Sequence, residues 1–278
     1  MLLATLLALG AAVLHATWNL IAKRATGDTY MVLWAQFFMG GVVSLPLIIG
    51  YQAIWGMPWQ AYVWAACSGM VHLPYVWLLA RAYQHGDFSV SYPVARGGGA
   101  ALAAGAGVVF LGDHLSGLEV LGIGVIVSGL VLLAYGATAP NIAMALAVAC
   151  TIGTYTTLDS KGARVSASVA YVFASGVGTA ASNTVFGLVT GRRREMTAML
   201  RGNLGRATVT GLASLVTYGM VLVAVRHAPV GYVSALRESS VVLAALAGWR
   251  LLGEGDHRRR LSAAMVVFAG LLVLVVGH

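Results

Sequence analysis

Two arginines fall inside long apolar stretches, Arg96 in one that begins near Phe88 and Arg237 in one that begins near Pro229. If such a stretch crosses a bilayer, a charge near its centre costs from about 2.5 kcal/mol upward, so the residue faces a cavity or a partner. Arginine keeps its proton and is a fixed cation suited to a carboxylate or phosphate. Two interpretations stay open: each arginine binds an anionic ligand, or backbone carbonyls or an acid such as Glu238 hold it in place.

Glu238 is the clearest acid inside an apolar stretch. It follows Arg237 directly and so points about 100° away around a helix, which means that an ion pair between the two neighbours is not automatic. A carboxyl group in a low-dielectric cavity can carry a coupling proton. The alternative is a structural partner for Arg96. Asp159 is a second candidate for proton coupling, although its closeness to Lys161 also fits a solvated helix cap.

Further polar and aromatic side chains recur at helical spacing. His15, Trp18 and Asn19 lie on one helix face, and so do Thr151, Tyr155 and Asp159. His72 can be a proton carrier or a hydrogen-bonded packing residue. The side chains expected to line a substrate site are Arg96, Arg237, Glu238, Trp18, Asn19, His15, His72, Tyr75, Tyr92, Tyr155, Tyr218 and Tyr232.

The sequence offers no motif for a metal or a nucleotide. Cys67 and Cys150 have no neighbours at metal-ligand spacing, and no Gly-x-x-x-x-Gly-Lys-Ser/Thr sequence occurs. A membrane-embedded enzyme would need a metal or acid cluster, for example His-Glu-x-x-His, and none is present. We therefore expect no cofactor, no metal and no enzymatic activity.

The elements that must position these residues are membrane-spanning helices. The composition, 59% hydrophobic and 9% charged with a mean hydropathy of +0.83, predicts an all-α integral membrane protein. A spanning helix needs about 20 apolar residues. Ten runs of about this length occur at 2–22, 30–50, 60–80, 88–111, 116–135, 141–159, 166–190, 207–225, 229–252 and 261–277.

The net charge of +8 reflects basic loops, so we expect contact with lipid headgroups and no nucleic acid. Of the 17 Lys and Arg residues, twelve fall on the connections after the first, third, seventh and ninth runs, and three on the opposite side. The positive-inside rule then places the twelve-residue side in the cytoplasm and both termini outside.

The two arginines also belong to an internal repeat with a period of 141 residues. The triplet Leu111-Gly112-Asp113 returns as Leu252-Gly253-Glu254, and Gly129 returns as Gly270. Five spans per copy invert the second copy, an architecture of transporters. We therefore expect two inverted five-helix repeats, 1–137 and 138–278, in one compact bundle. Each arginine would lie about 12 Å into the bilayer from opposite faces, so the two would meet near the midplane.

Three stretches carry a resemblance to a known family: the run from His15 to Lys23, the run from Ser91 to Gly97, and the two Leu-Gly-acid triplets. Together they resemble the ten-helix branch of the drug/metabolite transporter superfamily, the EamA-type transporters. The resemblance implies a proton- or gradient-driven carrier, or a facilitator, for small metabolites. It also implies a central cavity lined by the first, third, fourth, sixth, eighth and ninth helices.

Two features depart from the family pattern. Family members commonly keep both termini in the cytoplasm, against the charge count. The second copy has Ala-Leu-Arg237-Glu-Ser where the first has Val-Ala-Arg96-Gly-Gly, so the halves are not interchangeable.

The expected function is secondary transport, as an exporter or exchanger of small polar metabolites such as amino acids, by alternating access around a midplane cavity. An organic-anion or phosphate-type exchanger is the alternative within this class, and a membrane-embedded enzyme or a passive channel is the alternative outside it. We expect a multi-pass protein of the cell (inner or plasma) membrane, a monomer or homodimer. Its partners would be a small-molecule substrate, the lipid bilayer and a coupling proton.

Overall fold

The structure, a computed structural model, describes residues 2–25, 27–111, 115–135, 137–166, 168–224, 227, 233 and 236–277. Every regular element in these residues is a helix. The helices are α1 (Leu2–Lys23), α2 (Thr29–Ile54), α3 (Trp59–His85), α4 (Phe88–Ala106), the π-helical turn η1 (Gly107–Leu111), α5 (Gly117–Ala134), α6 (Ala139–Arg164), α7 (Ser168–Val189), α8 (Arg193–Ala224), α10 (Ser240–Leu252) and α11 (His257–Val276).

Eight of the described helices are long and apolar enough to cross a membrane. This confirms the prediction of an all-α membrane protein, and most predicted runs coincide with one helix. Two runs differ. Helix α8 begins at Arg193, well before the predicted start at 207, because its first turns are amphipathic and do not register as an apolar run. Within 229–252, the described regular helix begins only at Ser240.

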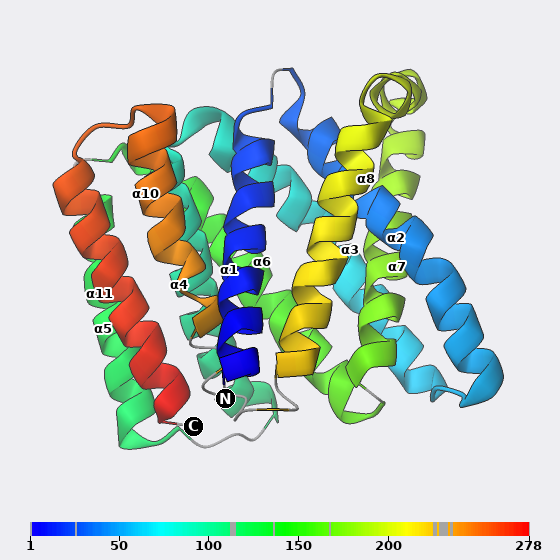
Figure 1. Cartoon of the computed structure of the whole chain (residues 1–278), viewed down its shortest axis with the longest axis horizontal. Helices are drawn as coiled ribbons and strands as arrows, with labels where there is room; N and C mark the ends of the chain where they lie inside the picture. Colours follow the sequence, from blue (N-terminus) through cyan, green and yellow to red (C-terminus); the bar gives the residue numbers. More distant parts are fainter. Residues whose placement is uncertain are drawn as a thin grey trace.

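The helices form one bundle with both chain ends at the same end of the molecule (Figure 1). Helices α5 and α11 pack together at one edge, next to α4 and α10, while α2, α3 and α7 pack together at the other. Between these groups, α1 packs on α8 and α10, and α6 packs on α3 and α4. The helices with the candidate site residues therefore surround the middle of the bundle.

The contact between α5 and α11 is reciprocal around two glycines that are 141 residues apart. A methyl group added at Gly129 would lie 2.8 Å from the backbone nitrogen of Val267. One added at Gly270 would lie 2.6 Å from the backbone nitrogen of Ile126, the residue equivalent to Val267. The small residues therefore allow close approach of the two helices, as expected of glycines in membrane bundles.

Gly253 ends α10 in the left-handed conformation, with φ of 67°, which is typical of a glycine at the end of a helix. The equivalent residues of the first copy, Gly112 and Asp113, lie outside the described residues.

Candidate functional site

Arg96, Arg237 and Glu238 form a triad around the buried carboxylate of Glu238. Arg96 forms an ion pair with Oε1 of Glu238, and Arg237 donates to the same oxygen at 2.8 Å. The two guanidinium groups therefore share one acceptor, while their place at the bilayer midplane stays a prediction. Glu238 lies in the turn just before α10, and the long arginine side chain reaches it although the two residues are sequence neighbours.

The triad contains two cations and one acid, and several of its polar atoms have no partner. The side chain of Glu238 is 8% exposed, that of Arg96 15% and that of Arg237 32%. Oε2 of Glu238 and Nε of both arginines are buried without a hydrogen bond to any described residue. Buried polar groups in native proteins are normally paired, so these atoms leave the hydrogen-bonding capacity of the triad partly unused among the described residues.

An aromatic wall from α1 and α4 adjoins the triad. Tyr92 lies one turn before Arg96 on α4, and its hydroxyl donates to Oγ of Ser240, two residues after Glu238, at 3.1 Å. The His15 ring lies 6.1 Å from that of Tyr92 and 5.0 Å from that of Trp18, measured between centroids. The predicted α1 stripe therefore reaches the residues that surround the triad.

Asn19 is fixed by two hydrogen bonds. Its Oδ1 accepts from the hydroxyl of Tyr83 at 2.6 Å, and its Nδ2 donates to the carbonyl of His15 at 2.8 Å. These contacts give Asn19 a structural role in joining α1 to α3. Binding of a substrate by Asn19 stays a prediction.

A second aromatic group joins α3 and α6. The rings of His72 and Tyr155 lie 4.2 Å apart, and Tyr75 lies 5.4 Å from Tyr155. Nδ1 of His72 is 2.8 Å from the carbonyl of Ser68, which fits the interpretation of a hydrogen-bonded packing residue. Phe37 on α2 links this group to the first one, with ring contacts to Trp18, His72 and Tyr75 at 6.4 to 6.5 Å.

Of the other predicted residues, Tyr218 and Asp159 stand apart from these contacts. Tyr218 is 40% exposed and lines an apolar cavity of about 250 Å³ between α7 and α8. Tyr232 lies outside the described residues. Asp159 is partly buried and accepts from the hydroxyl of Tyr171 at 2.8 Å and, at 3.5 Å, from that of Ser175. These contacts tie Asp159 to α7, and its part in proton coupling stays a prediction.

Sequence reasoning missed Phe37, Tyr83 and Ser240. Phe37 and Tyr83 are aromatic residues in long apolar helices, and nothing in their local sequence distinguishes them from packing residues. Ser240 had a signal, because Glu238, Ser239 and Ser240 form a polar run inside an apolar stretch.

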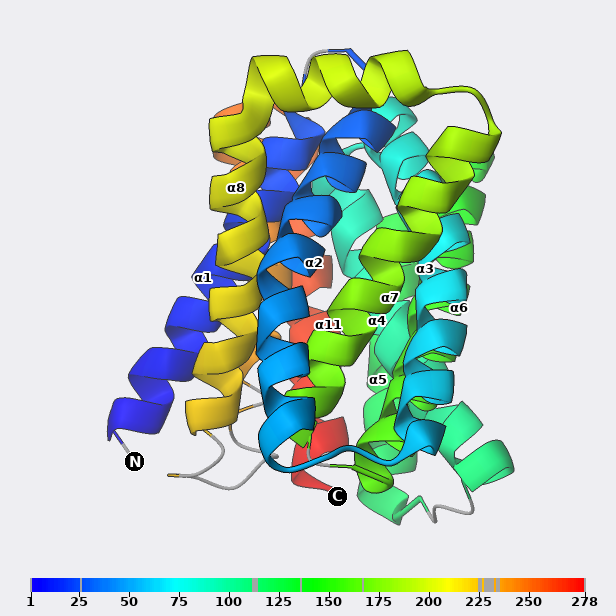
Figure 2. The ribbon, with the colours of Figure 1, turned by 90° about the vertical axis from the view of Figure 1, so that its right-hand side faces the viewer.

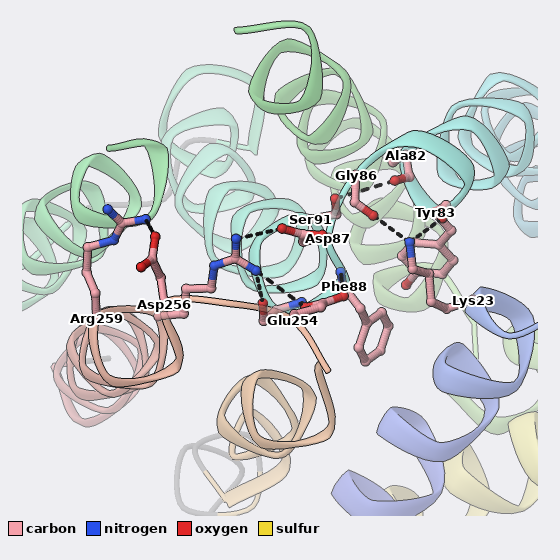
Figure 3. A network of polar contacts seen from close by, with 12 residues as sticks. Lys23, Ala82, Tyr83, Gly86, Asp87, Phe88, Ser91, Glu254, Asp256 and Arg259 are labelled. Atoms are coloured by element: carbon pink, nitrogen blue, oxygen red, sulfur yellow. Dashed lines mark hydrogen bonds and ion pairs between the residues drawn. The ribbon is translucent and has the colours of Figure 1, made fainter. Parts of the chain in front are cut away.

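The end of α4 that leads to Arg96 is fixed by Glu254, the acid of the second Leu-Gly-acid triplet. Its carboxylate accepts from the backbone nitrogens of Phe88 at 2.6 Å and Ser89 at 2.8 Å, which lie in the first turn of α4 (Figure 3). An acid at this place satisfies free N–H groups and the helix dipole. The triplet of the second half therefore positions the arginine-bearing helix of the first.

Two cations complete this network. Arg260 pairs with Asp87 at 2.6 Å and donates to Oγ of Ser89 at 3.0 Å. Lys23, at the end of α1, donates to the carbonyls of Tyr83 and Gly86, each at 2.6 Å (Figure 3). The connection between α3 and α4 is thus held from α1 and from the start of α11.

Comparison with known proteins supports the fold and the family. A solved crystal structure of a protein is similar over 98% of this chain and 96% of that chain, with a TM-score of 0.61 and 18% identity, a likeness that concerns the fold alone. A comparison with curated proteins gives no significant match. Residues 140–276 match the EamA-like transporter family. The second half of this multi-pass membrane protein is thus a domain of the EamA-like transporter family, which lies in the drug/metabolite transporter superfamily.

Proposed function

We propose that the protein is a secondary carrier of small polar metabolites that bear a carboxylate, with amino acids as the preferred class. The observation that carries the proposal is the triad: two partly buried arginines share one oxygen of the buried Glu238, while its other oxygen and both Nε atoms are unpaired among the described residues. The side chain of Arg237 is 32% exposed, and a charged side chain inside a membrane protein faces water or a ligand rather than lipid.

The two signs of charge favour a zwitterion. A substrate carboxylate would bind the guanidinium groups of Arg96 and Arg237 by charge-assisted hydrogen bonds. A substrate ammonium group would bind the free oxygen of Glu238, and the rings of Trp18, His15 and Tyr92 would bound the rest. An organic anion is the second candidate, and the observation that favours it is the net charge of +1 on the triad.

Alternating access would couple this site to motion of the two halves. Arg96 belongs to the first half and Glu238 to the second, so a substrate carboxylate that competes for Arg96 weakens a contact between them. The reciprocal packing of Gly129 and Gly270 supports two inverted repeats related by a two-fold axis. Protonation of Glu238 would release both arginines, which makes it our candidate for proton coupling. One chain supplies both halves, so a monomer suffices.

Transport by purified protein in liposomes tests this proposal. A panel of labelled amino acids, dicarboxylates and phosphate esters would be offered, with unlabelled substrate inside the vesicles. Saturable exchange of a chemically unchanged amino acid is expected, whereas a passive channel would show neither saturation nor exchange and an enzyme would alter the compound.

The arginines then have their own test. Arg96→Gln and Arg237→Gln should each reduce transport at least tenfold, because each removes a charge-assisted contact to the carboxylate. Arg81→Gln removes an exposed arginine that stacks on Trp77 and is the matched control. Full transport by both triad variants would rule out carboxylate binding by the triad.

A further inference from the structure

The first part of α8, residues 193–202, lies across one end of the bundle. The helix bends at Asn203, where φ is −134° and ψ is 21°, before it continues along the bundle axis. Figure 2 shows this first part at a steep angle to the spanning helices. Because the spans run through the bilayer, a helix across their ends lies in the plane of the membrane surface.

One face of this segment is fixed to the bundle. Met196 is buried in the core, and Met199 and Leu200 pack against it at helical spacing. Before the segment begins, Arg192 pairs with Asp28, the N-cap of α2, and with Glu195. The segment is therefore held in place from both its apolar and its polar side.

The opposite face is basic and open. Arg193, Arg194 and Arg201 are exposed and line a groove of about 540 Å³ together with Thr197 and Ala198. None of the three guanidinium groups has a hydrogen bond or ion pair to another described residue. The only acid in the segment, Glu195, is engaged by Arg192. The groove, which we call the α8 groove, therefore carries three positive charges without a protein partner in the described chain.

We propose that the α8 groove binds the phosphate headgroup of an anionic phospholipid. The planar guanidinium fork matches phosphate oxygens in a bidentate arrangement. A basic segment in the membrane plane lies at the depth of the headgroups, and each arginine there contributes a factor of about five to binding of an anionic membrane. The proposal concerns a lipid site away from the triad and does not depend on the transported substrate.

Lipid retention by the purified full-length protein tests the proposal. Native mass spectrometry would count bound phosphatidylglycerol and phosphatidylcholine after titration of each lipid into detergent-solubilised protein. The site variant is Arg193→Gln/Arg194→Gln/Arg201→Gln. The matched control, Arg81→Gln/Arg250→Gln/Arg258→Gln, removes three exposed arginines near the ends of α3, α10 and α11. We expect phosphatidylglycerol to bind with preference, and the site variant to bind it at least tenfold more weakly while the control binds it as the parent does.

Three outcomes would overturn the proposal. Equal binding of both lipids would show that headgroup charge is not recognised. Equal loss in the site and control variants would show a response to total charge rather than a site. Displacement of phosphatidylglycerol by an equal concentration of glycerol phosphate, which has no acyl chains, would show that the site binds soluble phosphate compounds. A melting temperature of the site variant equal to that of the parent would exclude misfolding as the cause of weaker binding.

Discussion

At the scale of single residues, one oxygen atom of Glu238 holds the two halves of the site together. Arg96 reaches it from α4 and Arg237 from the turn before α10. Such a pair is worth little when intact, because both charges have lost their hydration. Its removal is costly when one partner is left buried and unpaired. Substitutions of Arg96, Arg237 and Glu238 should therefore destabilise the protein by different amounts.

We predict that Glu238→Gln destabilises the protein more than Arg96→Gln. The first change leaves two buried cations without an acid and should cost about 3 kcal/mol or more, whereas the second leaves Glu238 paired with Arg237. The double variant Arg96→Gln/Glu238→Gln should be more stable than Glu238→Gln alone, because it removes one of the two cations that Glu238→Gln leaves without an acid. Unfolding in detergent, followed by melting temperature or denaturant, measures the series.

The control for this series is Arg259→Gln, which removes an ion pair with Asp256 at 3.0 Å. Asp256 is well exposed, so the expected cost is at most about 0.5 kcal/mol. If Glu238→Gln cost no more than this control, the triad would not be a stabilising element.

The sequence predicts which residues belong to the candidate site better than it predicts the contacts between them. Arg96, Arg237 and Glu238 stand out because charges are rare in apolar spans, and that rarity has a physical cost behind it. The pairing of Arg237 with Glu238 was not predictable, because it depends on the side-chain rotamers of two neighbours and not on their spacing along the helix. Phe37 was not predictable either, since an aromatic residue in a span has the same local sequence whether it faces lipid or a site.

At the scale of elements, glycine sets the distance between α5 and α11. Gly129 and Gly270 each face the backbone of the other helix, through Val267 and Ile126, and these pairs exchange under the 141-residue shift. Without a hydrophobic driving force in lipid, helices associate through such close packing. The repeated glycines Gly129 and Gly270 therefore belong to the same helix contact, one on each of the two helices.

We predict that Gly129→Ala and Gly270→Ala destabilise the protein by similar amounts, about 1 to 3 kcal/mol each, because both would force the helices apart. Gly124→Ala is the matched control on the same helix, since a methyl group there meets nothing within 4 Å. It should be neutral or slightly stabilising, because alanine has the higher helix propensity. A clearly different loss of stability on Gly129→Ala and on Gly270→Ala would contradict a symmetric contact.

The helices themselves were largely predictable, because a spanning helix must be apolar over its whole length. The first part of α8 escaped this reasoning for the converse reason: a helix in the membrane plane needs only one apolar face, here Met196, Met199 and Leu200. The helical spacing of Met196, Met199 and Leu200 between its arginines could have predicted it. The cap of α4 by Glu254 could not have been predicted, since it joins residues more than 160 positions apart.

At the scale of the whole molecule, contacts gather the basic connections at one end. Lys23 binds the carbonyl of Gly86, Arg24 donates to the carbonyl of Leu251, and Arg192 pairs with Asp28. These contacts join the connections after α1, α3, α7 and α10, and the twelve basic residues lie on these connections and in the helices next to them. The chain termini lie at the opposite end (Figure 1). The fold thus brings basic residues together at one end of the bundle, while the orientation of that end in the membrane stays a prediction.

The last prediction concerns that direction. Translocation of short loops rich in Lys and Arg is disfavoured, so the basic end should face the cytoplasm and both termini should lie outside. In a variant without Cys67 and Cys150, a cysteine would replace either Arg194, at the basic end, or Val165, on the connection between α6 and α7. Both positions are exposed, so a difference in labelling reports the side of the membrane on which the thiol lies and not its burial. A membrane-impermeant maleimide should label Val165→Cys in intact cells and Arg194→Cys only after permeabilisation. The reverse pattern would place the arginines of the α8 groove outside the cell and would show that the family habit of cytoplasmic termini outweighs the charge of the connections.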